Sequence, residues 1–100
     1  DDSKRLEQAG CFAIVLECIP NKLGDCVSRA VSVPTIGIGA GPHTDGQVLV
    51  LHDLLGADPD FCPKFLRRYA NVNQLVAGAL SGFHEDVRDQ SFPAPGETYG

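Results

Sequence analysis

The stretch AIVLECIP, residues 13–20, indicates how the rest of the chain folds. Five apolar residues run from Phe12 to Leu16, the pattern of a strand buried on both faces of a parallel sheet. Alternation along such a strand divides its side chains into two sets: Ala13, Val15 and Glu17 on one face, and Ile14, Leu16 and Cys18 on the other. In α/β barrels, active sites form where strands run out into their loops, so we expect Glu17 to face a crevice.

The residues on either side of this strand have helical patterns. Ser3–Gly10 indicates a helix that ends at a glycine cap, and a helix leading into a buried strand is the middle of an α/β repeat. We therefore expect the chain, which contains no methionine, to be the C-terminal part of a longer protein. Asn21 is a possible N-cap of the next helix. That helix carries one apolar stripe, made of Leu23, Cys26, Val27, Ala30 and Val31.

A second strand is predicted after Pro34, running from Thr35 into the glycine-rich turn at residues 37–41. If Ile36 and Ile38 face the covering helices, then Thr35, Gly37 and Gly39 face the interior of the barrel. Glycine leaves space there and makes backbone N–H groups reachable by a ligand. The candidates for contact with a cofactor are therefore Gly37, Gly39 and Gly41, and a tight, closely packed turn is the alternative.

A third short, buried strand is predicted over residues 47–51, ending at His52 and Asp53. These two side chains are either an acid–base or ligand-binding pair, or a cap for the segment that follows. A helix comes next, marked by an apolar stripe that we expect to cover a sheet. The stripe consists of Val72, Leu75, Val76, Ala79, Leu80, Phe83 and Val87.

The predicted fold class is α/β. Residues 1–91 are expected to form the C-terminal part of a (β/α)8 barrel, its last strands with their covering helices, and residues 92–100 an extended tail. An open doubly wound sheet is the alternative. Alone, such a piece would leave barrel-facing side chains such as Val15 and Val48 exposed, and it would bury too little surface to offset the chain entropy lost on folding.

Composition excludes several classes of partner. The net charge is −5 and the eight Lys and Arg residues are scattered, which argues against nucleic-acid binding. No apolar run approaches the roughly 18 residues of a membrane span. The four cysteines form no CxxC pair and are expected to be reduced packing residues of an intracellular protein. A zinc site combining them with His43, His52 or His84 would lack close ligand pairs.

Four sequence strings occur in the order found in one family. They are VLECIP at residues 15–20, TIGIGAG at 35–41, DGQVLVLHD at 45–53 and PKF at 63–65. Together they closely resemble the ketopantoate hydroxymethyltransferases, and the resemblance spans about residues 4–88.

The resemblance implies a (β/α)8 barrel of the phosphoenolpyruvate/pyruvate superfamily and a homo-oligomer. It implies transfer of a hydroxymethyl group from 5,10-methylenetetrahydrofolate to 3-methyl-2-oxobutanoate, with Mg²⁺ bound by the keto acid. Glu17 matches the family's general base, a role in which it would remove a proton from the carbon beside the ketone. The resemblance also implies that the metal-binding carboxylates precede Asp1, so these residues alone are expected to be inactive.

Two other functions remain open. The chain could belong to a related lyase or mutase acting on another α-keto acid. It could also be a truncated, non-catalytic remnant or subunit that only packs against a partner. Relatives of the resembled family are cytoplasmic in bacteria and mitochondrial in fungi and plants, so either compartment is expected.

Overall fold

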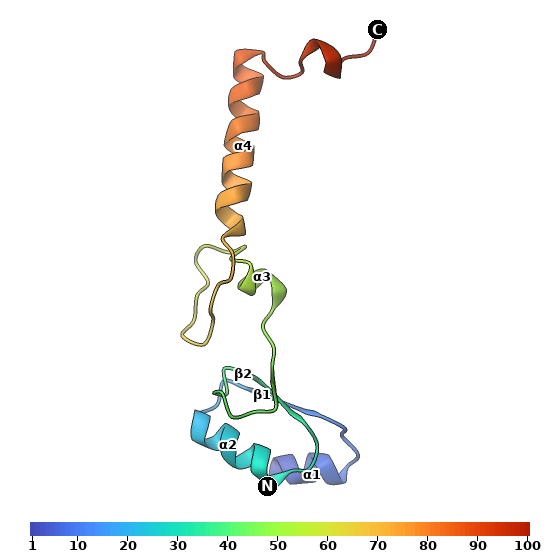
Figure 1. Cartoon of the computed structure of the whole chain (residues 1–100), viewed down its shortest axis with the longest axis vertical. Coiled ribbons are helices and arrows are strands. Elements are labelled where there is room, and N and C mark those ends of the chain that lie inside the picture. The colour runs from blue at the N-terminus through green and yellow to red at the C-terminus, as the bar shows by residue number, and fades with distance from the viewer.

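A computed structural model describes all residues from Asp1 to Gly100 (Figure 1). Its sheet has three parallel strands in the order β1-β2-β3. The strands are β1 (Ile14–Glu17), β2 (Thr35–Ile38) and β3 (Gly46–Gln47). Because Glu17 pairs with Ile38, the carboxyl ends of β1 and β2 lie side by side. The predicted α/β class with a parallel sheet is confirmed.

Two helices flank β1 in the sequence, α1 (Asp2–Gln8) and α2 (Asn21–Ala30). Helix α1 ends as predicted at Gly10, whose φ is +103°. The Gly10 N–H donates to the Glu7 carbonyl at 3.0 Å and the Cys11 N–H to the Leu6 carbonyl at 3.1 Å, which is a Schellman motif.

The N-cap of α2 is Pro20, so the predicted cap at Asn21 is wrong. The Leu23 and Gly24 N–H groups both donate to the Pro20 carbonyl at 3.0 Å, and the helix therefore begins one residue earlier than the sequence suggests. Of the predicted apolar stripe, Val31 is buried and Val27 half-buried. The other three residues of the stripe are exposed: Leu23, Cys26 and Ala30.

One face of the sheet carries the core. Ile14 and Leu16 of β1 are buried against Val31 and Ala40. The alternation predicted along β1 is confirmed, because buried and exposed residues alternate over its four positions. The other face of β1 is open in this chain: Val15 is 60% exposed, as expected for these residues without the rest of a barrel.

Strand β2 is oriented opposite to the sequence-based expectation. Thr35 pairs with Ile14 and is fully buried, with its hydroxyl 2.7 Å from the Ser28 hydroxyl of α2. Gly37 pairs with Leu16 and therefore lies on the same, helix-covered face. A Cβ added at Gly37 would meet the Thr44 hydroxyl oxygen at 2.8 Å, so the glycine makes room for the loop that follows β2.

Strand β3 is shorter than the predicted 47–51 segment. It pairs with β2 only at Ile36 and Gly37, the two central residues of that strand. One further bond joins the Val48 N–H to the Gly37 carbonyl at 3.0 Å. Strand β2 ends at Ile38, so residues 49 and 50 find no strand partner and Val50 is exposed.

The second half of the chain contains α3 (Leu51–Leu54), an irregular loop, α4 (Val72–Asp89) and the short 3-10 helix η1 (Pro95–Glu97). The loop folds back on α3 through backbone hydrogen bonds. The Tyr69 N–H donates to the Leu54 carbonyl at 2.8 Å and the Val72 N–H to the Leu55 carbonyl at 2.9 Å. Helix α4 therefore starts beside α3.

The molecule is elongated, measuring 69 × 29 × 16 Å. Its Cα radius of gyration is 22.5 Å, against about 13 Å for a compact domain of this length. Helix α4 forms as predicted but extends away from the sheet (Figure 1), so the expectation that it covers a sheet is wrong within this chain. None of its residues is buried.

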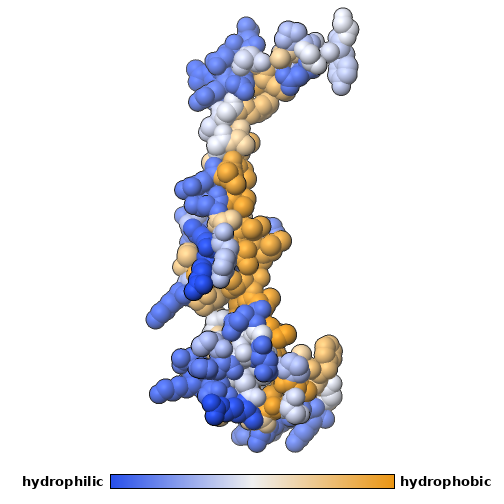
Figure 2. All heavy atoms as spheres, viewed as in Figure 1, coloured by the Kyte–Doolittle hydropathy of each residue, from blue (hydrophilic) through white to orange (hydrophobic).

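A band of hydrophobic residues runs along one side of the elongated body (Figure 2). Leu75 is 73% exposed and Leu80 63%. The predicted exposure of Val15 and Val48 is confirmed, and only nine of the 100 residues are buried. No helix combines the length and apolar character needed to cross a bilayer.

Candidate active site at the carboxyl end of the sheet

Glu17 is the last residue of β1 and lies on the face of the sheet that α2 leaves open. Its side chain is exposed, and it accepts no hydrogen bond and forms no salt bridge in this chain. Val15 and Ile38 belong to the same face. The position is the one that alternation along the strand indicates, and the catalytic role of Glu17 stays a prediction.

The backbone turns sharply directly after Glu17. Cys18 has φ +51°, a left-handed conformation that is uncommon outside glycine. Its N–H donates to the Ile38 carbonyl at 2.9 Å, and the Ile19 N–H donates to the Gly39 carbonyl at 3.1 Å. These bonds attach the turn to the end of β2, so Glu17 is carried on a backbone fixed on both sides. Local strain of this kind is characteristic of functional sites.

The glycine turn after β2 packs against the start of α2. Gly39 and Gly41 have φ +69° and +84°, values that glycine adopts readily. A Cβ on Gly41 would overlap the Asn21 side chain, and one on Gly24 would overlap the Ala40 carbonyl oxygen. Close packing therefore explains why glycine stands at position 41 as well as at position 37. This agrees with the alternative given for these glycines, a tight and closely packed turn.

A hollow of about 430 Å³ opens beside the turn. It is lined by Gly39, Gly41, Pro42, Gln47 and Phe65. The Gln47 amide nitrogen donates to the Gly41 carbonyl at 2.8 Å and to the Thr44 hydroxyl at 3.1 Å, which holds this side chain in place. Of the three candidate glycines, Gly39 and Gly41 line the hollow, whereas Gly37 does not.

Phe65 and Gln47 were not among the residues that sequence reasoning assigned to a site. Phe65 lies in the irregular loop after α3, and a Cβ on Gly39 would meet its ring at 3.1 Å. Both residues belong to the strings on which the family resemblance rests, DGQVLVLHD and PKF. Their presence in these strings is the sequence feature that points to a role for Phe65 and Gln47. The spacing of residues along the chain does not predict that residues 39 and 65 lie together.

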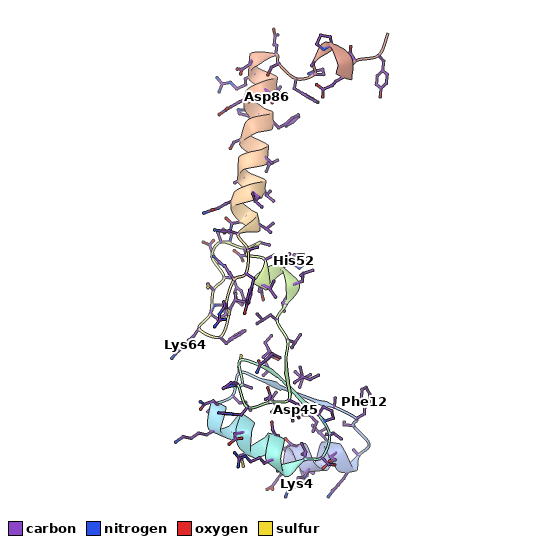
Figure 3. All side chains as sticks on the ribbon, in the orientation of Figure 1. Lys4, Phe12, Asp45, His52, Lys64 and Asp86 are labelled. Atoms are coloured by element: carbon purple, nitrogen blue, oxygen red, sulfur yellow. The ribbon has the colours of Figure 1, made fainter.

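His52 and Asp53 lie in α3, beyond the end of β3. Figure 3 places His52 on this helix, away from the strands, and Lys64 at the end of the loop nearest the sheet. The N-cap of α3 is Val50, so neither residue caps it. Neither side chain makes a hydrogen bond or salt bridge within the chain.

The chain assembles no metal centre of its own. No group of three His, Cys, Asp or Glu side chains comes together. All four cysteines are free, and Cys18, Cys26 and Cys62 are exposed in this chain, so their packing role stays a prediction. An ion such as Mg²⁺ has no ligand set among these residues.

Comparison with known proteins identifies the family. The model of a family described as ketopantoate hydroxymethyltransferase matches residues 1–95. The chain belongs to this family. The four sequence strings at residues 15–20, 35–41, 45–53 and 63–65 predict membership of this family. The match confirms that resemblance over nearly the whole chain.

Curated relatives in this family carry the name 3-methyl-2-oxobutanoate hydroxymethyltransferase. The relative from Salinibacter ruber is 56% identical over 98 residues, which are 98% of this chain and 37% of the relative. Those from Chlorobaculum tepidum and a Methylobacterium species are both 54% identical over 99 residues, 99% of this chain and 36% and 34% of the relatives. The chain thus spans little more than a third of their length.

Proposed function

We propose that these residues form part of an enzyme that transfers a hydroxymethyl group to 3-methyl-2-oxobutanoate. The donor is 5,10-methylenetetrahydrofolate and the product is 2-dehydropantoate. The observation that carries the proposal is the family match over residues 1–95, together with an acidic side chain at the open carboxyl end of β1. The name of the relatives, which gives the transferred group and its acceptor, supports it.

Glu17 acts as the general base in this proposal. Its carboxylate takes the proton from C3 of the keto acid, and the electrons of the broken C–H bond move toward the ketone oxygen as an enolate. C3 then forms a bond to the one-carbon unit of the donor. The methylene carbon of the donor is bonded to two nitrogens, and both of these bonds break, the first as C3 bonds to the carbon and the second as water supplies the hydroxyl group. Tetrahydrofolate is then released with one proton on each nitrogen, one derived from C3 and one from water. A base on a fixed strand end keeps the geometry that proton removal needs.

The sheet is proposed to be part of a (β/α)8 barrel of the phosphoenolpyruvate/pyruvate superfamily. Strands β1 and β3 are edge strands in this chain, and barrel closure removes such edges. The open face with Val15 and Glu17 would then line the barrel, and the apolar stripe of α4 would find cover. The ligands for Mg²⁺ would come from outside these residues, and we expect the complete enzyme to be a homo-oligomer.

A chimera tests the proposed function. The matching 98 residues of this chain replace their counterparts in the Salinibacter ruber relative, with which they share 56% identity. We expect the purified chimera to form 2-dehydropantoate from 3-methyl-2-oxobutanoate and 5,10-methylenetetrahydrofolate, and to restore growth without pantothenate to a strain lacking the transferase. A folded chimera, judged by circular dichroism and size-exclusion chromatography, that forms no product would overturn the proposal.

A further inference from the structure

The hollow beside the glycine turn has no charged side chain in its lining. Its side chains are those of Pro42, Gln47 and Phe65, and glycine backbone makes up the rest. A site for the carboxylate of an α-keto acid needs a cation or a metal ion to offset the charge, and this lining offers neither. Its chemistry suits a neutral ligand.

The lining residues carry polar groups of the kinds that pair with the edge of a heteroaromatic ring. The N–H groups of Gly39 and Gly41 donate no hydrogen bond within the chain. The Gln47 amide nitrogen is occupied by Gly41 and Thr44, which leaves the amide oxygen of Gln47 as an acceptor. Donors and an acceptor are thus available together, as a ring carrying both a carbonyl and N–H groups requires.

An aromatic side chain forms one wall. Phe65 is 37% exposed and its ring lies against Gly39, where an added Cβ would stand 3.1 Å from it. A flat ligand can stack on such a wall with the glycine backbone beneath it.

The hollow lies at the edge of the sheet where Glu17 ends β1. The Gly39 carbonyl accepts the Ile19 N–H at 3.1 Å, so the floor of the hollow adjoins the turn that follows Glu17. A ligand in the hollow would therefore lie next to a ligand bound at Glu17, with the end of β2 between them. The two substrates of a transfer reaction need to be held side by side in this way.

We propose that the hollow binds the reduced pterin ring of 5,10-methylenetetrahydrofolate, stacked on Phe65 with its amide edge toward Gln47 and the glycine N–H groups. The inference rests on the proposed function and adds to it the residues that bind the donor. Phe65 and Gln47 are then binding residues for the folate, separate from the keto acid that Glu17 serves.

The experiment uses the chimera described above and its Phe65→Ala, Phe65→Leu and Phe61→Ala variants. Phe61 lies in the same loop, is 44% exposed and does not line the hollow, so it provides a matched control. Isothermal titration calorimetry measures the Kd of tetrahydrofolate. Deuterium uptake at C3 of 3-methyl-2-oxobutanoate, followed by NMR without folate, measures the keto-acid step alone.

We expect Phe65→Ala and Phe65→Leu to weaken tetrahydrofolate binding about tenfold or more, because each removes the stacking ring. Leucine keeps an apolar contact with Gly39, so a shared loss points to the ring rather than to misfolding. Deuterium uptake stays within about twofold of the parent, and Phe61→Ala changes neither quantity. Unchanged tetrahydrofolate binding in the folded Phe65→Leu variant overturns this inference alone. Absence of deuterium uptake in the parent chimera overturns the proposed function instead.

Discussion

Gly24 and Gly41 allow the turn after β2 to lie directly against α2. Each stands where an added Cβ would overlap its neighbour, the Ala40 carbonyl oxygen for Gly24 and the Asn21 side chain for Gly41. Glycine within a helix costs about 1 kcal/mol relative to alanine. The close approach of the turn to α2 explains why a glycine is present in this helix. The same approach positions the turn that bounds the hollow.

Replacing Gly24 by alanine tests this contact. In the chimera, we expect Gly24→Ala to lower the free energy of unfolding by about 1–3 kcal/mol through overpacking, although alanine is the better helix former. Chemical denaturation measures the change. Gly78→Ala is the control, because a Cβ there meets nothing in the chain. Equal or greater stability of Gly24→Ala would contradict the packing described for this turn.

Glu7 joins the first helix to the segment before β2. The Ser32 hydroxyl and the Ser32 N–H, the latter at 2.7 Å, both donate to one oxygen of the Glu7 carboxylate. The side-chain bond from Ser32, followed by the backbone bond, holds the pKa of Glu7 below its usual value. This contribution to stability is present above the ordinary glutamate pKa of about 4.3, and it is lost as the pH falls through the lower folded-state pKa.

The Ser32→Ala variant of the chimera should therefore be less stable than the parent near neutral pH. We expect the gap between their denaturation midpoints to narrow as the pH falls below about 4, where the Glu7 carboxylate takes up a proton in both proteins. A gap that stays constant from neutral pH to about pH 3 would show that Glu7 contributes no titrating interaction with Ser32.

The residue pattern predicted the face of Glu17 but not that of Gly37. A period of two sorts strand residues into two sets, which is sufficient to put Glu17 with Val15 and opposite Ile14. It does not say which set of the next strand meets the helices. The isoleucines of β2 are the more apolar set, yet Thr35 and Gly37 face α2, because a hydroxyl pair with Ser28 and the side chain of Thr44 fill that space.

At the level of elements, one carboxylate joins the start of β2 to the start of β3. Asp45 accepts the Thr35 N–H at 2.8 Å and the Thr35 hydroxyl at 3.1 Å, while its own N–H donates back to that hydroxyl at 3.2 Å (Figure 3 labels Asp45). These bonds hold the loop of residues 39–45 so that β3 pairs in parallel with β2, with no helix between the two strands. The position of Gln47 in the hollow depends on this return.

We expect Asp45→Ala in the chimera to lower the free energy of unfolding by about 1.5–3 kcal/mol, the range for hydrogen bonds to a charged group. Asp45→Asn should lose less, because its amide oxygen can still accept the Thr35 N–H. Denaturation curves of the two variants provide the comparison. An equal loss in both would show that the charge, rather than the hydrogen bonds to Thr35, accounts for the stability.

Element prediction from the sequence succeeded where the pattern was local. The stripe from Val72 to Val87 was sufficient to predict α4, and Gly10 was sufficient to predict the end of α1. It failed where a partner decides the outcome. Strand β3 stops at Gln47 because β2 ends at Ile38, and the stripe of α4 cannot show which surface covers it.

At the scale of the whole molecule, the chain has too little core to stand alone. Nine buried residues and an uncovered apolar band match a part of a larger fold (Figure 2). Burial on this scale cannot offset a backbone entropy cost of about 1–2 kcal/mol for each ordered residue. The proposed barrel and the proposed substrates rest on family resemblance alone, because the contacts within this chain indicate neither of them.

The 100-residue chain expressed by itself should therefore lack a cooperative unfolding transition. We expect it to bind the dye ANS through its exposed apolar band. Its radius of gyration, measured by small-angle X-ray scattering, should be well above the roughly 13 Å of a compact domain. A monomer of that compact size with a sharp thermal transition would contradict the assignment of this chain as a part of a larger fold.

The most direct test of the central claim is the Glu17→Gln variant of the chimera. Deuterium uptake at C3 of 3-methyl-2-oxobutanoate in D₂O with Mg²⁺, followed by NMR, reports proton removal without any folate. Glu85→Gln, an exposed carboxylate on α4, is the matched control. We expect Glu17→Gln to lose about 10²-fold or more in exchange rate, while Glu85→Gln exchanges like the parent. Equal exchange in the parent and in folded Glu17→Gln would show that Glu17 is not the base.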